Sequence, residues 1–214
     1  DSRRGLASVN FTYGNKVAVL IGDFLLANSL LCSVKTGNTR LVEIISIAAQ
    51  NLADGELLQL DNVKNTEISE DIYYHIIRNK TAALFAACAE GGALSVGASE
   101  SDIERLKSFG EIVGMCFQIR DDIFDYEKDS RIGKPYGNDM KEGKLTLPLI
   151  HVLFKMKDEE MFKIAYRIKE GNVTDDEIER IVEFTKVNGG IDYAKKVMGE
   201  YAERAKALLS VYPD

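Results

Sequence analysis

The sequence predicts an all-α protein, and three observations lead to that fold class. Apolar residues recur at spacings of three and four along almost the whole chain, as they do on one face of a helix. Alternating runs rich in β-branched residues, which are typical of strands, are missing. The composition, with 45% hydrophobic and 29% charged residues and 3 prolines, is that of a folded chain. We therefore expect a single helical domain over residues 1–214 and no sheet.

Helix breakers and caps divide the chain into its predicted elements. A turn at Thr36-Gly37-Asn38 is followed by a predicted cap at Thr39, and Thr174 has the capping-box spacing to Glu177. The stretch 127–144 is rich in Gly and Lys and is predicted to be a long loop, a kind of segment that is usually functional or mobile. The predicted helices are Asn15–Val34, Arg40–Leu60, Ser69–Gly91, Ser101–Tyr126, Leu147–Phe154, Asp158–Ile168, Thr174–Asn188 and Gly190–Leu209.

The first predicted helix is unusually apolar. The segment 17–34 reaches the length of about 18 apolar residues at which a membrane-spanning helix becomes possible. Asp23 and Asn28 lie near its middle, and an aspartate there would be costly in lipid. We therefore predict a helix buried inside the protein and no membrane span.

Charge, cysteines and chain ends limit the class of protein. The net charge of −7 and the pI of about 5.1 argue against a general nucleic-acid binder. The three cysteines match no metal spacing and are predicted to be reduced core thiols of a cytoplasmic protein. The chain begins at Asp1 without Met and ends just after Pro213, so we expect it to be incomplete at the N-terminus and at the C-terminus.

Three carboxylates lie near the end of the predicted helix 101–126. Asp121 and Asp125 are four residues apart and Asp122 lies beside them, so all three are predicted to converge on one helix face. Anions repel at this spacing, and the C-terminal end of a helix dipole disfavours them. Mg²⁺ is the cation that suits such oxygen ligands, together with substrate phosphates. The alternative is a solvated acidic face, but the apolar flanks favour a buried helix.

Basic residues lie at three predicted element boundaries. Each group could neutralise a diphosphate bound through the metal. The simpler alternatives are solvated arginines and a lysine that extends from a core helix to the solvent. Glycines in the 127–144 loop would let it fold over a phosphate as a lid. The residues are Arg3 and Arg4, Lys80 with Thr81, and Lys134 with Lys144.

Five ordered blocks over most of the first 150 residues resemble the all-trans polyprenyl diphosphate synthases. They are RRG, YGNKVAVLIGDFLLA, the Lys80-Thr81 pair, FQIRDDIFDY and GKPYGNDMKEGKLTLPLI. The resemblance implies an isoprenoid synthase-type bundle of mostly antiparallel helices around a deep central cavity, commonly active as a homodimer. It also implies Mg²⁺-dependent, head-to-tail transfer of an allylic prenyl group onto isopentenyl diphosphate, repeated with trans double bonds.

The resemblance assigns roles to individual residues. Asp121, with Asp122 and Asp125, would hold Mg²⁺, and Gln118 with Thr81 would offer oxygen dipoles to the carbocation. Arg4 would bind the diphosphate of isopentenyl diphosphate. Arg3 and Lys80 would bind the diphosphate of the allylic substrate. Substrate diphosphate would also be bound by Thr81, Lys134 and Lys144. Lys80 and Lys134 would in addition stabilise the diphosphate leaving group. The catalytic set is therefore Lys80, Gln118, Asp121 and Lys134.

One departure from the family pattern leaves alternatives open. The first aspartate-rich motif, which precedes the arginine pair in the family, is absent, and only Asp1 and Ser2 stand before Arg3. The chain therefore holds half of the metal site that the two aspartate-rich motifs form in the family, and we do not expect it to turn over substrate by itself. The alternatives are a noncatalytic regulatory subunit of a heteromeric synthase, a terpene cyclase-like or head-to-head condensing enzyme, and a plain helical scaffold. Product length stays open between C10 and C50, although residues 53–60 resemble medium- or long-chain synthases.

Overall fold

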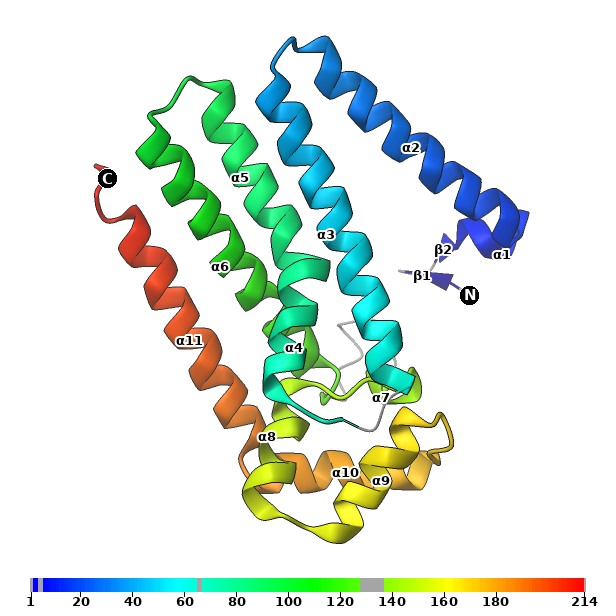
Figure 1. Ribbon diagram of the computed structural model, residues 1–214. Helices are drawn as coiled ribbons and strands as arrows, with labels where there is room; N and C mark the ends of the chain where they lie inside the picture. The colour runs from blue at the N-terminus through cyan, green and yellow to red at the C-terminus, as the bar shows by residue number, and fades with distance from the viewer. Residues whose placement is uncertain (1, 4–5, 65–66, 128–136, 214) are drawn as a thin grey trace. The chain divides into compact units, whose positions relative to one another are not determined.

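The computed structural model describes residues 2–3, 6–64, 67–127 and 137–213, and these are helical almost throughout (Figure 1). The predicted all-α class is confirmed. The chain divides into two compact units, Asp1–Ile47 and Ala48–Asp214, and the division falls inside helix α3.

The first unit contains a small ladder and two helices before α3 begins. Strand β1 (Ser2–Arg3) pairs antiparallel with β2 (Leu6–Ala7), and helices α1 (Val9–Tyr13) and α2 (Asn15–Lys35) follow. The prediction that no sheet forms is wrong for these four residues, because two-residue strands are too short to produce an alternating pattern. Helix α1 was not predicted either, since five residues give barely one turn of periodicity.

Helix α2 agrees with its predicted range, but its predicted burial is wrong. Its large apolar side chains are exposed, with 65% for Leu20 and 66% for Phe24, and within this fully described helix only Ser33 is buried. By length and composition alone α2 could cross a membrane, and 6% of its most apolar 18-residue window is buried within the protein. Apolar residues occur all around α2, so at least one face needs a partner for burial.

Helix α3 (Thr39–Lys64) starts one residue before the predicted range, and its cap differs from the prediction. The Asn38 side-chain oxygen Oδ1 accepts hydrogen bonds from the backbone nitrogens of Arg40 and Leu41, at 3.0 and 3.3 Å. Asn38 therefore caps α3, and Thr39 is its first helical residue. Asparagine is a better N-cap than threonine, which explains why Asn38 and not its neighbour Thr39 takes the cap position.

The second unit holds the remaining helices, and most of the predicted ranges are confirmed within one or two residues. The predicted helix 69–91 is divided by a π-helical segment, η1, and a short helix, α7, lies inside the predicted loop. Thr174 and Glu177 form the predicted capping box. The elements are α4 (Glu70–Ile77), η1 (Arg78–Ala82), α5 (Ala83–Ser95), α6 (Glu100–Phe124), α7 (Asn138–Lys141), α8 (Leu147–Met156), α9 (Glu159–Lys169), α10 (Asp175–Val187) and α11 (Gly190–Leu209).

Helix α6 packs between α5 and α11 in this unit (Figure 1). Two glycines of α6 let it approach the preceding helical segment closely. A Cβ atom at Gly110 would lie 2.5 Å from the carbonyl oxygen of Phe85, and one at Gly114 would lie 2.5 Å from Cα of Ala82. The small residues therefore fix the position of α6, whose last turn carries the aspartates.

Helix α8 joins the two hydrophobic clusters of the second unit. Leu149, Val152 and Leu153 belong to one cluster and Leu147 and Ile150 to the other, and all five are at most 3% exposed. Burial of each such side chain contributes about 1.5–3 kcal/mol. This core lies beneath the end of α6 and holds it in place.

The cysteines are free, but the predicted core location is wrong. Cys32 and Cys88 are exposed and Cys116 is partly buried. Apolar neighbours in the sequence suggested burial, but in α2 and α5 apolar residues occur on more than one face, so the pattern does not identify the buried one.

Candidate functional site

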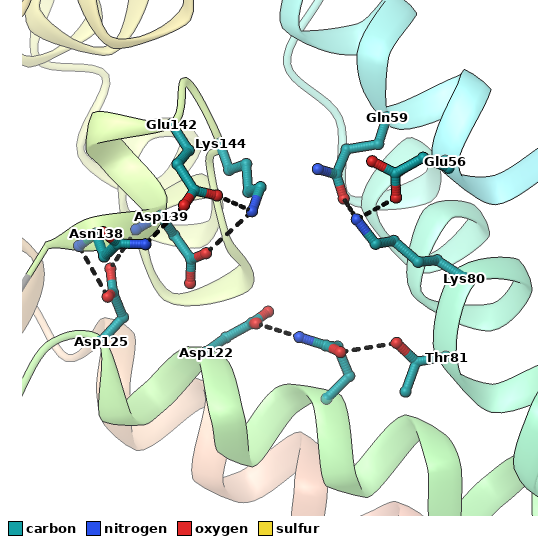
Figure 2. A network of polar contacts seen from close by, with 11 residues as sticks. Glu56, Gln59, Lys80, Thr81, Asp122, Asp125, Asn138, Asp139, Glu142 and Lys144 are labelled. Carbon is teal, nitrogen blue, oxygen red and sulfur yellow. Dashed lines mark hydrogen bonds and ion pairs between the residues drawn. The ribbon is translucent and has the colours of Figure 1, made fainter. Parts of the chain in front are cut away.

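Lys80 lies in η1 and is held by two side chains of α3. Its ammonium Nζ is 2.5 Å from Oε2 of Glu56 and donates a 3.0 Å hydrogen bond to Oε1 of Gln59 (Figure 2). Gly55 allows this approach, because a Cβ atom there would lie 2.5 Å from the backbone nitrogen of Lys80. An ammonium has three N–H donors, so one more can serve an incoming acceptor. We call Glu56, Gln59 and Lys80 the Lys80 cluster.

A chain of hydrogen bonds runs from Thr81 to the end of α6. The Thr81 hydroxyl donates to Oε1 of Gln118 at 2.8 Å, and Nε2 of Gln118 donates to Oδ1 of Asp122 at 2.8 Å. The Tyr73 hydroxyl donates to the other carboxylate oxygen of Asp122 at 2.7 Å. The structure thus brings together three of the residues selected from the sequence, Thr81, Gln118 and Asp122.

Burial dominates the electrostatics of Asp122, which is 3% exposed. Desolvation raises its pKa to about 7, although hydrogen bonds from Tyr73 and Gln118 act to lower it. The charges of Asp139 and Asp121 act in the same direction as desolvation. Since like charges and a dry environment disfavour the carboxylate, a cation at this end of α6 would stabilise it.

Asp125 differs from the prediction that it converges with the other two aspartates. Its Oδ1 accepts a 2.9 Å hydrogen bond from the backbone nitrogen of Asn138, and its Oδ2 accepts one of 3.2 Å from that of Asp139 (Figure 2). The residue is 3% exposed. Both oxygens of the Asp125 carboxylate are therefore directed at the start of α7.

Lys144 is held by carboxylates that α7 and the following turn provide. Its ammonium contacts the carboxylate of Glu142 and lies 3.5 Å from Oδ1 of Asp139 (Figure 2). Asn138 donates from Nδ2 to Oε1 of Glu142 at 2.8 Å. Desolvation opposes the charge of Lys144, yet these partners raise its pKa above the usual value. We call Asn138, Asp139, Glu142 and Lys144 the Lys144 cluster.

The predicted three-carboxylate centre does not form among the residues that the structure describes, in which no group of three or more His, Cys, Asp or Glu is arranged to hold a metal ion. Asp121, adjacent to Asp122, is partly buried on the last turn of α6. Periodicity predicted a common helix face for the three aspartates, but it could not show that Asp125 is engaged by a distant backbone.

The other predicted basic residues fall mostly outside the part described. Arg3 belongs to β1 in the first unit, whereas Arg4 and Lys134 lie outside the described residues. The roles assigned to these three residues from the sequence stay predictions.

Several polar residues that build the site were not among those selected from the sequence. Glu56 and Gln59 are three apart on α3 next to Gly55, a spacing that places both on one face and could have indicated a cation partner. Tyr73 gave no such signal, because a tyrosine in an apolar helical stretch is typical of a core. Asp139 and Glu142 alternate with lysines in the predicted loop and had no periodicity to interpret.

This is a helical protein in which two lysine clusters and the aspartate end of one helix form a polar site. A family profile described as "Polyprenyl synthetase" matches residues 1–185. The chain belongs to the polyprenyl synthetase family.

Individual relatives agree with that assignment. The chain is 35% identical over 215 residues to octaprenyl diphosphate synthase of Escherichia coli (strain K12), covering 100% of this chain and 66% of the relative. A crystal structure of geranylgeranyl pyrophosphate synthase from Bacteroides thetaiotaomicron superposes with a TM-score of 0.90 and 51% identity, over 95% of this chain and 67% of that one.

A second solved structure contains a metal and a ligand. It is polyprenyl synthase from Caulobacter crescentus CB15 complexed with calcium and isoprenyl diphosphate, with a TM-score of 0.91 and 34% identity over 99% of this chain and 65% of that one. The chain thus spans about two thirds of the length of the relatives it matches. The fold these structures share is the predicted isoprenoid synthase fold.

Proposed function

We propose that the protein carrying this chain is a trans-polyprenyl diphosphate synthase, which condenses isopentenyl diphosphate head to tail with an allylic prenyl diphosphate. The observation that carries the proposal is the arrangement of Lys80 and Lys144. They come from distant parts of the chain, and Lys80 is paired with the carboxylate of Glu56 and Lys144 with that of Glu142 (Figure 2). Two ammonium groups opposite an acidic helix end suit a diphosphate bound together with a divalent cation.

Mg²⁺ is the proposed cofactor, and the donor set fits it. Asp121 would hold the ion, with Asp122 beside it, since Mg²⁺ usually binds through one or two carboxylates plus substrate phosphates. The raised pKa of Asp122, about 7, fits a site whose carboxyl gains charge when a cation binds. When bound, Mg²⁺ would neutralise the charge that develops on the diphosphate leaving group.

The chain's own residues would bind and orient the diphosphate. Lys80 would donate its third N–H to a phosphate oxygen, and Lys144 would exchange a contact with Glu142 for one with the substrate. Thr81 and Gln118 would direct oxygen dipoles toward the developing carbocation, beside a helix face that excludes water. Arg3, Arg4 and Lys134 complete the proposed set on the resemblance alone.

The same proposal includes a cytoplasmic homodimer. The exposed apolar side chains of α2 support an interface with a second copy, since Asp23 in that helix makes a lipid environment costly. Free cysteines support the cytoplasmic location. Leu25→Lys should convert dimers to monomers in sedimentation velocity, whereas a variant that stays dimeric would place the interface elsewhere.

The function is tested by elongation. The full protein, given farnesyl diphosphate, isopentenyl diphosphate and Mg²⁺, should make longer trans-polyprenyl diphosphates, and EDTA should stop the reaction. Asp121→Asn should lower turnover by about 10²–10³-fold with the fold retained. A folded protein that elongates no allylic primer would contradict the proposal. Elongation only after another synthase subunit is added would indicate the regulatory alternative.

A further inference from the structure

Asp125 is the residue of the aspartate motif whose carboxylate binds the start of α7. Both of its side-chain oxygens accept backbone hydrogen bonds from the start of α7, and its own carbonyl oxygen accepts one from Gly137 at 3.1 Å. The residue is 3% exposed. We propose that Asp125 is a positioning residue, which anchors α7 to the end of α6 and thereby sets the location of Lys144, and that it is not a third metal ligand.

The hydrogen bonds explain why a carboxylate is needed at this buried position. Burying a charge is costly unless it is hydrogen-bonded, and two N–H groups directed at one carboxylate satisfy that requirement. A neutral amide could serve only one of them, because its nitrogen is itself a donor. The site therefore requires an acceptor on both branches of the side chain, which selects Asp over Asn.

Helix α7 depends on an external anchor because it is too short to be stable alone. It has four residues, Asn138–Lys141, and a helix of one turn has almost no intrinsic stability. Gly137, at φ 66°, turns the chain into it, and a Cβ atom there would lie 2.6 Å from Ile178. Met140, 2% exposed, attaches the opposite side of α7 to the core. Asp125 supplies the polar half of this attachment.

The location of Lys144 depends on that of α7. The backbone nitrogen of Lys144 donates to the carbonyl oxygen of Asp139 at 2.9 Å, and its ammonium contacts Asp139 and Glu142. Asp139 in turn is one of the two residues that Asp125 accepts from. The carboxylate of Asp125 is thus connected to the ammonium of Lys144 through one residue, Asp139.

The inference deepens the proposed function and rests on it for one point, that Lys144 binds diphosphate. Its test compares Asp125→Asn with Asp121→Asn. Hydrogen exchange of residues 138–144 should become at least tenfold faster in the Asp125 variant and stay unchanged in the Asp121 variant. Exchange in α11 serves as an internal control that the fold is intact. Unchanged exchange of 138–144 in Asp125→Asn would overturn the proposal.

Binding of inorganic diphosphate without metal provides the second measurement. Asp125→Asn should weaken it by about tenfold, the size expected for a displaced charge-assisted contact. In a Lys144→Ala background the same change should have no further effect. Asp121→Asn should leave metal-free binding unchanged or tighter. It should instead raise the Mg²⁺ concentration needed for half-maximal binding in the presence of diphosphate.

The outcomes separate the two proposals. If Asp125→Asn raises the Mg²⁺ requirement as Asp121→Asn does and leaves metal-free binding intact, Asp125 is a metal ligand and the inference is wrong. If the unmodified full protein binds no diphosphate while exchange of 138–144 still depends on Asp125, the anchor stands and the proposed function fails.

Discussion

The Lys80 cluster and the Lys144 cluster each hold a lysine with oxygen ligands, but they fix its location by different means. Lys80 lies in a long helical segment that packs against α3 at Gly55, where backbone contact leaves no space for a side chain. Lys144 follows a one-turn helix that is attached through hydrogen bonds to Asp125. Close packing at Gly55 therefore fixes the location of Lys80, and the hydrogen-bond acceptors of Asp125 fix that of Lys144. A larger side chain at position 55 should displace Lys80, whereas loss of an acceptor at position 125 should displace Lys144.

Removing the ammonium of Lys80 should produce the largest effect. Lys80→Met keeps the aliphatic stem and should lower turnover of the full protein by about 10²–10³-fold, as expected when an electrostatic stabiliser is lost. Stability should change little, because the Glu56 carboxylate left behind is 48% exposed. Steady-state kinetics with thermal melting measures both, and turnover above a tenth of the original would remove Lys80 from the catalytic set.

Adding one methyl group at Gly55 tests whether volume fixes Lys80. Gly55→Ala should lower the free energy of unfolding by about 1–3 kcal/mol, because the new Cβ would lie 2.5 Å from the Lys80 backbone nitrogen. Gly92→Ala is the matched control, since a Cβ there meets nothing within 4 Å, and it should stabilise the helix by about 0.5–1 kcal/mol. Denaturant titration decides, and equal effects of the two changes would refute the close-packing argument.

Removing the counter-ion should strengthen the attraction of Lys80 for anions without moving it. Glu56→Gln keeps an oxygen acceptor but removes a charge, so metal-free binding of inorganic diphosphate should tighten by about three- to tenfold, less so at high salt. Glu111→Gln is the control, because Glu111 pairs with Arg78 of the same η1 segment at 3.1 Å. Titration calorimetry that gives weaker binding for Glu56→Gln would show that its charge positions Lys80.

Acid should loosen the Lys144 cluster slightly. Desolvation acts against the charge of Glu142 and is the largest single effect, but the hydrogen bonds from Lys144 and Asn138 and the nearby lysine charges together outweigh it, so the pKa lies below the usual value of 4.5. A depressed carboxyl pKa gives stability that is present above pH 4.5 and is lost as the pH falls through the folded value. Because the Glu142 side chain is 51% exposed, the loss should stay below about 1 kcal/mol.

The measurement for this last effect is an NMR titration of Asn138 and Lys144 signals between neutral pH and pH 3. Glu142→Gln should remove the response that the unmodified protein shows. A response that persists in the variant would assign the titration to another carboxyl group of the cluster.

Helical periodicity predicted the elements well, and it predicted the site only where the ligands share a helix. Gln118 and Asp122, both selected from the sequence, are four apart on α6, and a hydrogen bond links them. The partners of Lys80 lie on α3, and those of Asp125 are backbone groups twelve or more residues further along the chain. No local sequence pattern therefore predicts these contacts. The exposure of α2 was missed because periodicity cannot tell a core from an interface with another molecule.

The π-helical turn η1 also marks a place where the length of this chain can change by one residue. Residues 78–82 amount to one residue more than an α-helix needs between α4 and α5. Deleting one of them would close the wide turn to regular α-helix and leave the helices on either side in nearly the same register. Ala86 would then still face Gly110 of α6. The change would fall on the turn itself, which carries Lys80. We therefore expect a one-residue deletion here to alter the presentation of Lys80 more than the packing of α5 on α6.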